Sequence, residues 1–85
     1  MTTIELTAGK NFGHRSSVEL CDMLNRETSP ITSIRLSKND GVRQCNAKSL
    51  IGLLSLSIRK GDIITAFVNG NDHDYVIKKL TEYIV

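Results

Sequence analysis

The residues best suited to chemistry lie in residues 11–19 (NFGHRSSVE), where His14 is followed by Arg15, Ser16 and Ser17. A neutral imidazole nitrogen is a nucleophile, and a neighbouring arginine can hold an anionic group through paired hydrogen bonds. Backbone amides at the start of a helix also attract anions. The segment therefore has two interpretations, a reactive histidine at the start of a helix or an ordinary surface turn. On residue type alone, the surface turn is the simpler one.

The length and the charge of the chain narrow its class. With 85 residues it forms one domain, residues 1–85, with a small core and no second lobe. Eleven Lys and Arg against nine Asp and Glu give a net charge of +2, and the basic residues are scattered. A nucleic-acid binder clusters its basic residues and often adds aromatic platforms. We therefore expect no direct contact with nucleic acid.

The sequence also predicts the compartment. Residues 1–10 (MTTIELTAGK) do not start with basic residues followed by an apolar stretch, so no signal peptide is visible. No apolar run approaches the roughly 18–20 residues that a membrane span needs. We expect a cytoplasmic protein without membrane insertion.

The remaining residues with reactive side chains give no sign of an enzyme. Cys21 and Cys45 lack the spacing of a metal or redox motif, and both are expected to be small buried hydrophobes. His73 lies in an acidic first helical turn, where a solvated surface histidine is expected. The chain has no paired carboxylates beside a second base, no metal-ligand cluster and no P-loop. We expect no metal, no cofactor and no catalytic turnover.

Changes in the apolar pattern predict the elements that must position these residues. Alternating or β-branched runs indicate strands, and apolar residues three or four apart indicate helices. Ser16 or Ser17 is the expected N-cap of the first helix, and Asp40 and Gly41 form the expected tight turn. The predicted elements are strand 2–7, a helix from Ser16, strand 31–37, strand 42–47, a short helix within 46–58 that is closed by a glycine in 59–62, strand 63–68 and helix 72–84.

Each of the three predicted helices has an apolar face, which in the short helix consists of Leu50, Leu53 and Leu54. Their expected buried residues are Val18, Leu20, Cys21 and Leu24 in the first helix, and Val76, Leu80 and Tyr83 or Ile84 in the last. Three amphipathic helices and a small sheet predict a two-layer α+β domain with the helices on one face.

Residues 46–70 (NAKSLIGLLSLSIRKGDIITAFVNG) resemble the second half of HPr, the histidine-containing phosphocarrier of the bacterial sugar phosphotransferase system, and of its relative Crh. Both run through an AKS segment into a short helix, a KG-type turn, a β-branched strand and an acidic start of the last helix. The resemblance covers nearly the whole chain and is closer from Asn46 onward. It implies an open-faced sandwich in which three helices cover one face of a four-stranded antiparallel sheet.

The resemblance gives Ser49 a regulatory role. In many Gram-positive bacteria an ATP-dependent kinase phosphorylates the matching serine, and the residues matching Ile51 and Leu54 dock partner proteins. A serine at a helix start presents its oxygen beside free amides, which can also hold a phosphate. The alternative is that Ser49 only caps its helix, and the two interpretations are compatible.

The first half departs from the family, whose carrier motif reads Gly-Leu-His-Thr/Ala-Arg-Pro-Ala. If Arg15 matches the family arginine, Gly13 stands in the place of the histidine, His14 replaces Thr or Ala, and Ser16 replaces proline. If His14 is the carrier histidine, one residue has been lost before Arg15. The first alignment needs no gap and is the simpler one. About five extra residues lie between Arg15 and Ser49, which we expect near the end of the first helix and in residues 37–44.

The first functional hypothesis is a phosphocarrier of the phosphoenolpyruvate-dependent system, acting as a monomer. His14 would accept the phosphoryl group from enzyme I and pass it to A-type domains of sugar permeases, while Arg15 and the amides of Ser16 and Ser17 hold the phosphate. The second is a Crh-like regulatory protein, in which a serine kinase modifies Ser49 and a catabolite-control transcription factor binds Ile51 and Leu54. The third is a binding domain in which neither site is modified. The carrier role stands slightly ahead of the regulatory one.

Overall fold

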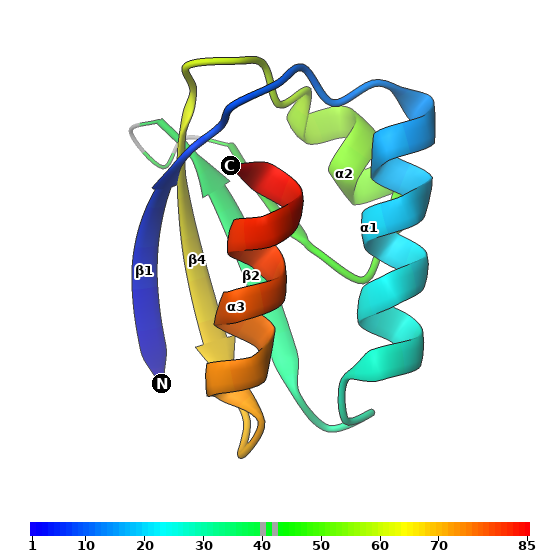
Figure 1. Ribbon diagram of the computed structural model, residues 1–85, viewed down its shortest axis with the longest axis vertical. Coiled ribbons are helices and arrows are strands. Elements are labelled where there is room, and N and C mark those ends of the chain that lie inside the picture. Colours follow the sequence, from blue (N-terminus) through cyan, green and yellow to red (C-terminus); the bar gives the residue numbers. More distant parts are fainter. Residues whose placement is uncertain (40, 42) are drawn as a thin grey trace.

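A computed structural model of the protein describes residues 1–39, 41 and 43–85. Over these residues the strands and helices follow the predicted order and form two layers (Figure 1). The elements are β1 (Thr2–Thr7), α1 (His14–Glu27), β2 (Ser33–Lys38), β3 (Arg43–Asn46), α2 (Leu50–Leu56), β4 (Ile63–Asn69) and α3 (His73–Ile84). None of the helices in this part of the chain is long and apolar enough to cross a membrane.

The strands form one antiparallel sheet in the order β1-β4-β2-β3. Ala66 of β4 lies in the centre, opposite Ile4 of β1 and Leu36 of β2. Because side chains alternate along a strand, the apolar half of each central strand faces the helices and the other half faces away. The three helices cover a single face, so the predicted open-faced α+β sandwich is confirmed.

The core lies between the sheet and the helices. The fully buried residues of the last helix are Val76, Leu80 and Ile84, as its apolar spacing predicts, while Tyr83 is partly exposed. In α1 the buried residues are Ser17, Leu20, Met23 and Leu24. Val18 is 36% exposed and Cys21 is partly exposed, so the prediction that both are buried was wrong. The buried stripe is centred on Leu20 and Leu24, which leaves Val18 and Cys21 at its edge.

Helix α1 begins earlier than its sequence predicts. Its N-cap is Gly13 and no side chain caps it, so the expectation of Ser16 or Ser17 as N-cap was wrong. The amide of Ser17 already donates to the carbonyl of Gly13 at 3.1 Å. The reason is tertiary, because buried Phe12 fixes the preceding loop by donating its amide to Ile58 at 2.8 Å. The chain turns into the helix directly after this anchor.

Helix α2 ends at Leu56 rather than at a glycine, which corrects a further expectation. Ser57 takes the left-handed conformation, with a φ of 55°, and its carbonyl accepts from the Lys38 ammonium at 2.8 Å. This turn sends Ile58 into the core, where it is 1% exposed. The burial of Ile58 therefore ends the helix, and Gly61 serves the next turn with a φ of 94°.

The hairpin between β2 and β3 is present, with Lys38 opposite Arg43. The expected turn residue Asp40 lies outside the described residues. The connection between α1 and β2 is held by Asp72, whose carboxylate accepts from the amide of Ser29 and from the hydroxyl of Thr32. These bonds tie the connection to the start of α3.

Candidate functional site

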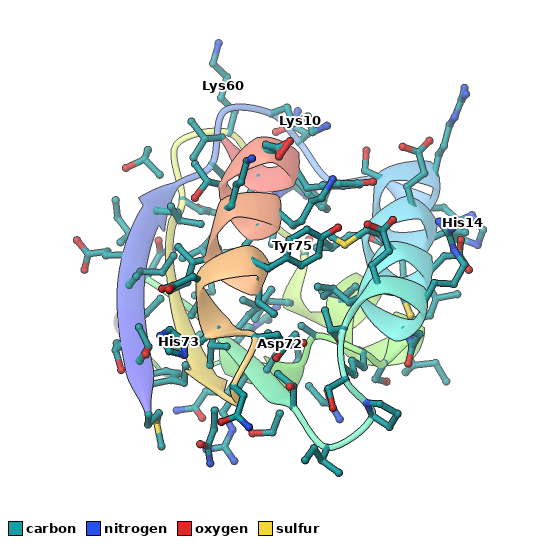
Figure 2. All side chains as sticks on the ribbon, turned by 60° about the horizontal axis from the view of Figure 1, so that its bottom comes forward. Lys10, His14, Lys60, Asp72, His73 and Tyr75 are labelled. Atoms are coloured by element: carbon teal, nitrogen blue, oxygen red, sulfur yellow. The ribbon has the colours of Figure 1, made fainter. Side chains whose placement is uncertain are left out.

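His14 is the first residue of α1 and is exposed (Figure 2). Arg15 follows it, with 94% of its side chain exposed. Its guanidinium Nε donates to Glu19 Oε1 at 3.2 Å, one turn further along the helix. The arginine therefore points along the helix surface toward Glu19, and its role in holding an anion beside His14 stays a prediction.

The start of α1 offers three backbone donors. Because Gly13 is the N-cap and the Ser17 amide is the first to find an intrahelical acceptor, the amides of His14, Arg15 and Ser16 have none. Such amides attract anions. Ser17 is different, since it is 1% exposed and its hydroxyl has no hydrogen-bond partner among the residues that the structure describes. The phosphate-binding role expected for Ser16 and Ser17 stays a prediction. The Ser17 amide already donates to the carbonyl of Gly13.

Basic side chains lie around this helix start. The loop before α1 and the turn before β4 are joined by the amide of Gly61, which donates to Ala8, and by the amide of Lys60, which donates to the Asn11 side chain. Lys60 is exposed here, and Lys10 extends over the ring of Phe12, with its ammonium 5.6 Å from the ring centre (Figure 2). Together with Arg15 they make this edge attractive to an acidic partner or an anion.

Ser49 is the N-cap of α2, as its place at the start of the short helix predicts. Its hydroxyl oxygen accepts from the Gly52 amide at 3.2 Å, and its own amide donates to Asn46. Its side chain is partly exposed. Ser49 therefore caps the helix, and this geometry is compatible with either interpretation of the residue.

The two residues expected to dock a partner are on the surface. Ile51 is 78% exposed and Leu54 is 39% exposed, both on α2. An apolar side chain as exposed as Ile51 adds nothing to the core, which Leu53 and Leu56 supply from the other face of the helix. The pair forms a small apolar surface next to Ser49, and its role in docking stays a prediction.

Helices α1 and α2 run antiparallel and carry both candidate sites on one side of the molecule. The carbonyl of Lys48, just before α2, accepts from Cys21 Sγ at 3.3 Å and from the Asn25 side chain at 3.0 Å in the second half of α1. At the other end, Ile58 accepts from Phe12, just before α1. Ser49 thus lies beside the middle of α1, and the end of α2 lies beside the start of α1. No sequence pattern pointed to Asn25.

The cysteines are packing residues in this arrangement. Cys21 and Cys45 are both free and partly buried against the core. Burial raises the pKa of the Cys45 thiol to about 11, while a backbone hydrogen bond at Leu36 opposes the rise. A thiol that stays protonated is a poor nucleophile and a poor metal ligand. In the described part of the chain, no three His, Cys, Asp or Glu side chains are grouped to hold a metal ion.

Comparison with known proteins identifies the family. The family model described as PTS HPr component phosphorylation site matches residues 2–85. The chain belongs to the HPr family. The HPr-like protein Crh of Halalkalibacterium halodurans is 37% identical over 59 residues, which are 69% of each chain.

Solved structures agree with this membership. The phosphocarrier protein HPr from Bacillus anthracis matches with a TM-score of 0.84 and 26% identity, over 99% of this chain and 96% of that one. Crh of Bacillus subtilis, described as a dimer with a swapping domain, matches with a TM-score of 0.71 and 28% identity, over 98% and 90% of the two chains. Proteins of the HPr family are phosphocarriers of the phosphotransferase system rather than enzymes, and they interact with its components, such as enzyme I.

Proposed function

We propose that this HPr-family protein is a regulatory member of the Crh type, switched by phosphorylation of Ser49. The observation that carries the proposal is that the Ser49 hydroxyl caps α2 directly before the exposed Ile51 and Leu54. A phosphate on this oxygen adds about −1.5 to −2 charges. It would therefore change the charge of the surface that a partner contacts, with little need to move the backbone.

The start of α1 supports placing the regulatory role ahead of the carrier role. The side chain of an N-cap residue lies over the free amides of its helix, whereas the next side chain points away from them. The N-cap is Gly13, which has no side chain, and His14 follows it. This arrangement agrees with the gap-free alignment, in which Gly13 stands in the place of the carrier histidine.

A binding assay with a catabolite-control transcription factor of this system tests the proposal. We expect the Ser49-phosphorylated protein to bind at least tenfold more tightly than the unmodified one, and Ser49→Ala to show no gain after treatment with the serine kinase. Ile51→Ser and Leu54→Ser should each weaken the phosphorylated complex. Ile31→Ser is the matched control, because Ile31 is 86% exposed in the connection between α1 and β2. Equal binding with and without phosphate, or an equal loss in the control, would contradict the proposal.

The carrier role is the second candidate, favoured by the exposure of His14 beside three amides that lack intrahelical partners. Phosphoenolpyruvate and enzyme I would then give an acid-labile phosphoryl group that is lost in His14→Ala. The regulatory proposal predicts instead that the wild-type protein stays unlabelled and that Gly13→His gains the label. A side chain fits at this position, since Gly13 has an ordinary φ of −88° and nothing within 4 Å of an added Cβ.

A further inference from the structure

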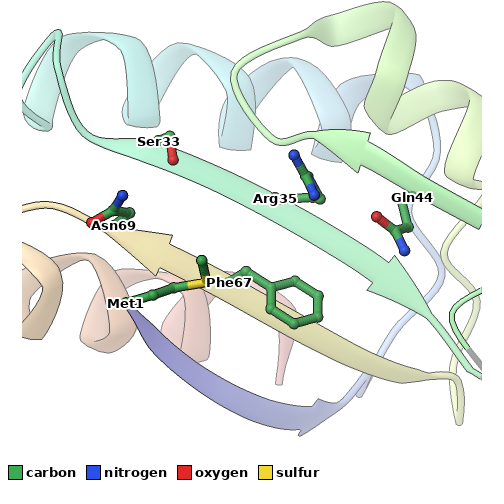
Figure 3. Close-up of a pocket in the computed structure, with 6 residues that line it drawn as sticks. All are labelled: Met1, Ser33, Arg35, Gln44, Phe67 and Asn69. Atoms are coloured by element: carbon green, nitrogen blue, oxygen red, sulfur yellow. The ribbon is translucent and has the colours of Figure 1, made fainter.

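The face of the sheet that the helices leave uncovered carries a hollow of its own. It has a volume of about 330 Å³ and lies on the side of the sheet that faces away from the helices (Figure 3). The lining residues are Met1, Ser33, Arg35, Gln44, Phe67 and Asn69. A smaller hollow of about 130 Å³ shares Ser33 and Arg35 with it.

Phe67 gives this hollow an aromatic wall. It lies on the central strand β4, opposite Thr3 of β1 and Arg35 of β2, and it is partly exposed. Its strand neighbours Ala66 and Val68 are buried toward the helices, so the ring is on the open face. A partly exposed ring on the open face of a sheet is suited to stacking against another planar ring.

Arg35 has the one charged side chain of the lining. It is exposed, and across the part of the chain that the structure describes its guanidinium has no ion pair and no cation–π contact. A guanidinium binds a carboxylate or phosphate through two parallel hydrogen bonds. Glu5, exposed on β1 opposite Thr65, carries a negative charge on the same face. The hollow therefore matches one anionic group rather than a polyanion.

Polar side chains complete the lining. Ser33 and Asn69 lie opposite each other on β2 and β4, and Gln44 lies on β3. The Gln44 amide nitrogen donates to Gly41 at 3.2 Å, which orients the side chain and leaves its oxygen as an acceptor. An aromatic wall, one charged side chain and a few hydrogen-bonding groups are the usual contents of a small-molecule site, and the volume is at the lower end of the range for such sites.

We propose that this hollow, the sheet-face pocket, binds a small molecule with a planar ring and one anionic group. The ring would stack on Phe67 and the carboxylate or phosphate would pair with Arg35. This site is separate from the α1–α2 face, so the proposal does not depend on whether Ser49 or His14 is modified.

Titration of the ¹⁵N-labelled protein, followed by amide chemical shifts, tests the proposal. The probes are adenosine monophosphate and 1-naphthoate, which distinguish a phosphate from a carboxylate, and adenosine is the uncharged control. We expect saturable shifts at Arg35, Gln44 and Phe67 with at least one charged probe, and at least tenfold weaker binding of adenosine. Arg35→Gln and Phe67→Leu should each weaken binding at least tenfold, while Arg59→Gln, an exposed arginine after α2, should leave it unchanged.

Three results would overturn the proposal. The first is the absence of saturable shifts with either probe at low millimolar concentration. The second is an equal loss of probe affinity in Arg35→Gln and Arg59→Gln, which would show that the probes are held by general charge attraction. The third is an affinity for octauridylate, a short RNA, more than tenfold higher than that for adenosine monophosphate. This result would show that the open face of the sheet binds polynucleotides instead.

Discussion

At the scale of single residues, the N-caps of α1 and α2 differ in what they present to solvent. Gly13 caps α1 through its backbone alone, whereas Ser49 caps α2 with its hydroxyl. The type of Ser49 and its place before an apolar run were enough to predict its position. The orientation of Arg15 toward Glu19 could not be predicted, because it depends on which of several exposed partners an arginine meets.

Removing the Ser49 hydroxyl should weaken the fold. We expect Ser49→Ala to lower the free energy of unfolding by about 1 kcal/mol, since the Gly52 amide loses its acceptor. Ser49→Asp should keep most of the stability, because a carboxylate also accepts from the first turn. Urea unfolding measures both, with Ser55→Ala, an exposed serine of α2, as the control. A Ser49→Ala protein as stable as the control would show that the cap contributes nothing.

Cys45 should make stability depend on pH in the alkaline range. Its pKa is raised by burial from 9.0 to about 11, so the folded state favours the protonated thiol. This contribution is fully present below pH 9 and is lost as the pH rises toward 11. We expect Cys45→Ala to show a shallower loss of stability between these pH values than the wild-type protein, in urea unfolding. Parallel pH profiles for the two proteins would count against a buried thiol.

At the scale of elements, regular periodicity was predictable and the ends of helices were not. Strand β1 and the buried stripe of α3 follow from spacing alone. The start of α1 depends on the Phe12 anchor, and the end of α2 depends on the burial of Ile58. Both are long-range contacts that no local pattern records. The carrier loop was hard to predict for this reason, since one helix position decides whether Gly13 or His14 stands at the N-cap.

The loop after β1 is closely packed against the end of α3. Gly9 donates its amide to the carbonyl of Ile84, and a Cβ added at Gly9 would overlap the backbone oxygen of Val85. We expect Gly9→Ala to lower the free energy of unfolding by about 1–3 kcal/mol, because the backbone must move. Gly13→Ser is the control, where open space and a capping serine predict no loss. A Gly9→Ala protein with the same thermal unfolding midpoint as the wild-type protein would show that the backbone at Gly9 is not closely packed against Val85.

At the scale of the whole molecule, the sheet separates two surfaces. The antiparallel packing of α1 and α2 brings the His14 and Ser49 regions to one side, and the sheet-face pocket lies on the other (Figures 1 and 3). The fold class and the family resemblance were predictable from the sequence. The sheet-face pocket was not predictable, because it depends on the strand register. This register places Phe67 opposite Arg35, although the two residues are 32 positions apart in the chain (67 − 35).

The most direct test of the regulatory role is phosphorylation by the serine kinase of this system with ATP, read by intact mass. We predict a single phosphoryl group that survives mild acid and is absent from Ser49→Ala, with Ser55→Ala labelled like the wild-type protein. The absence of any adduct, while a known Crh is labelled in the same reaction, would contradict the proposed function.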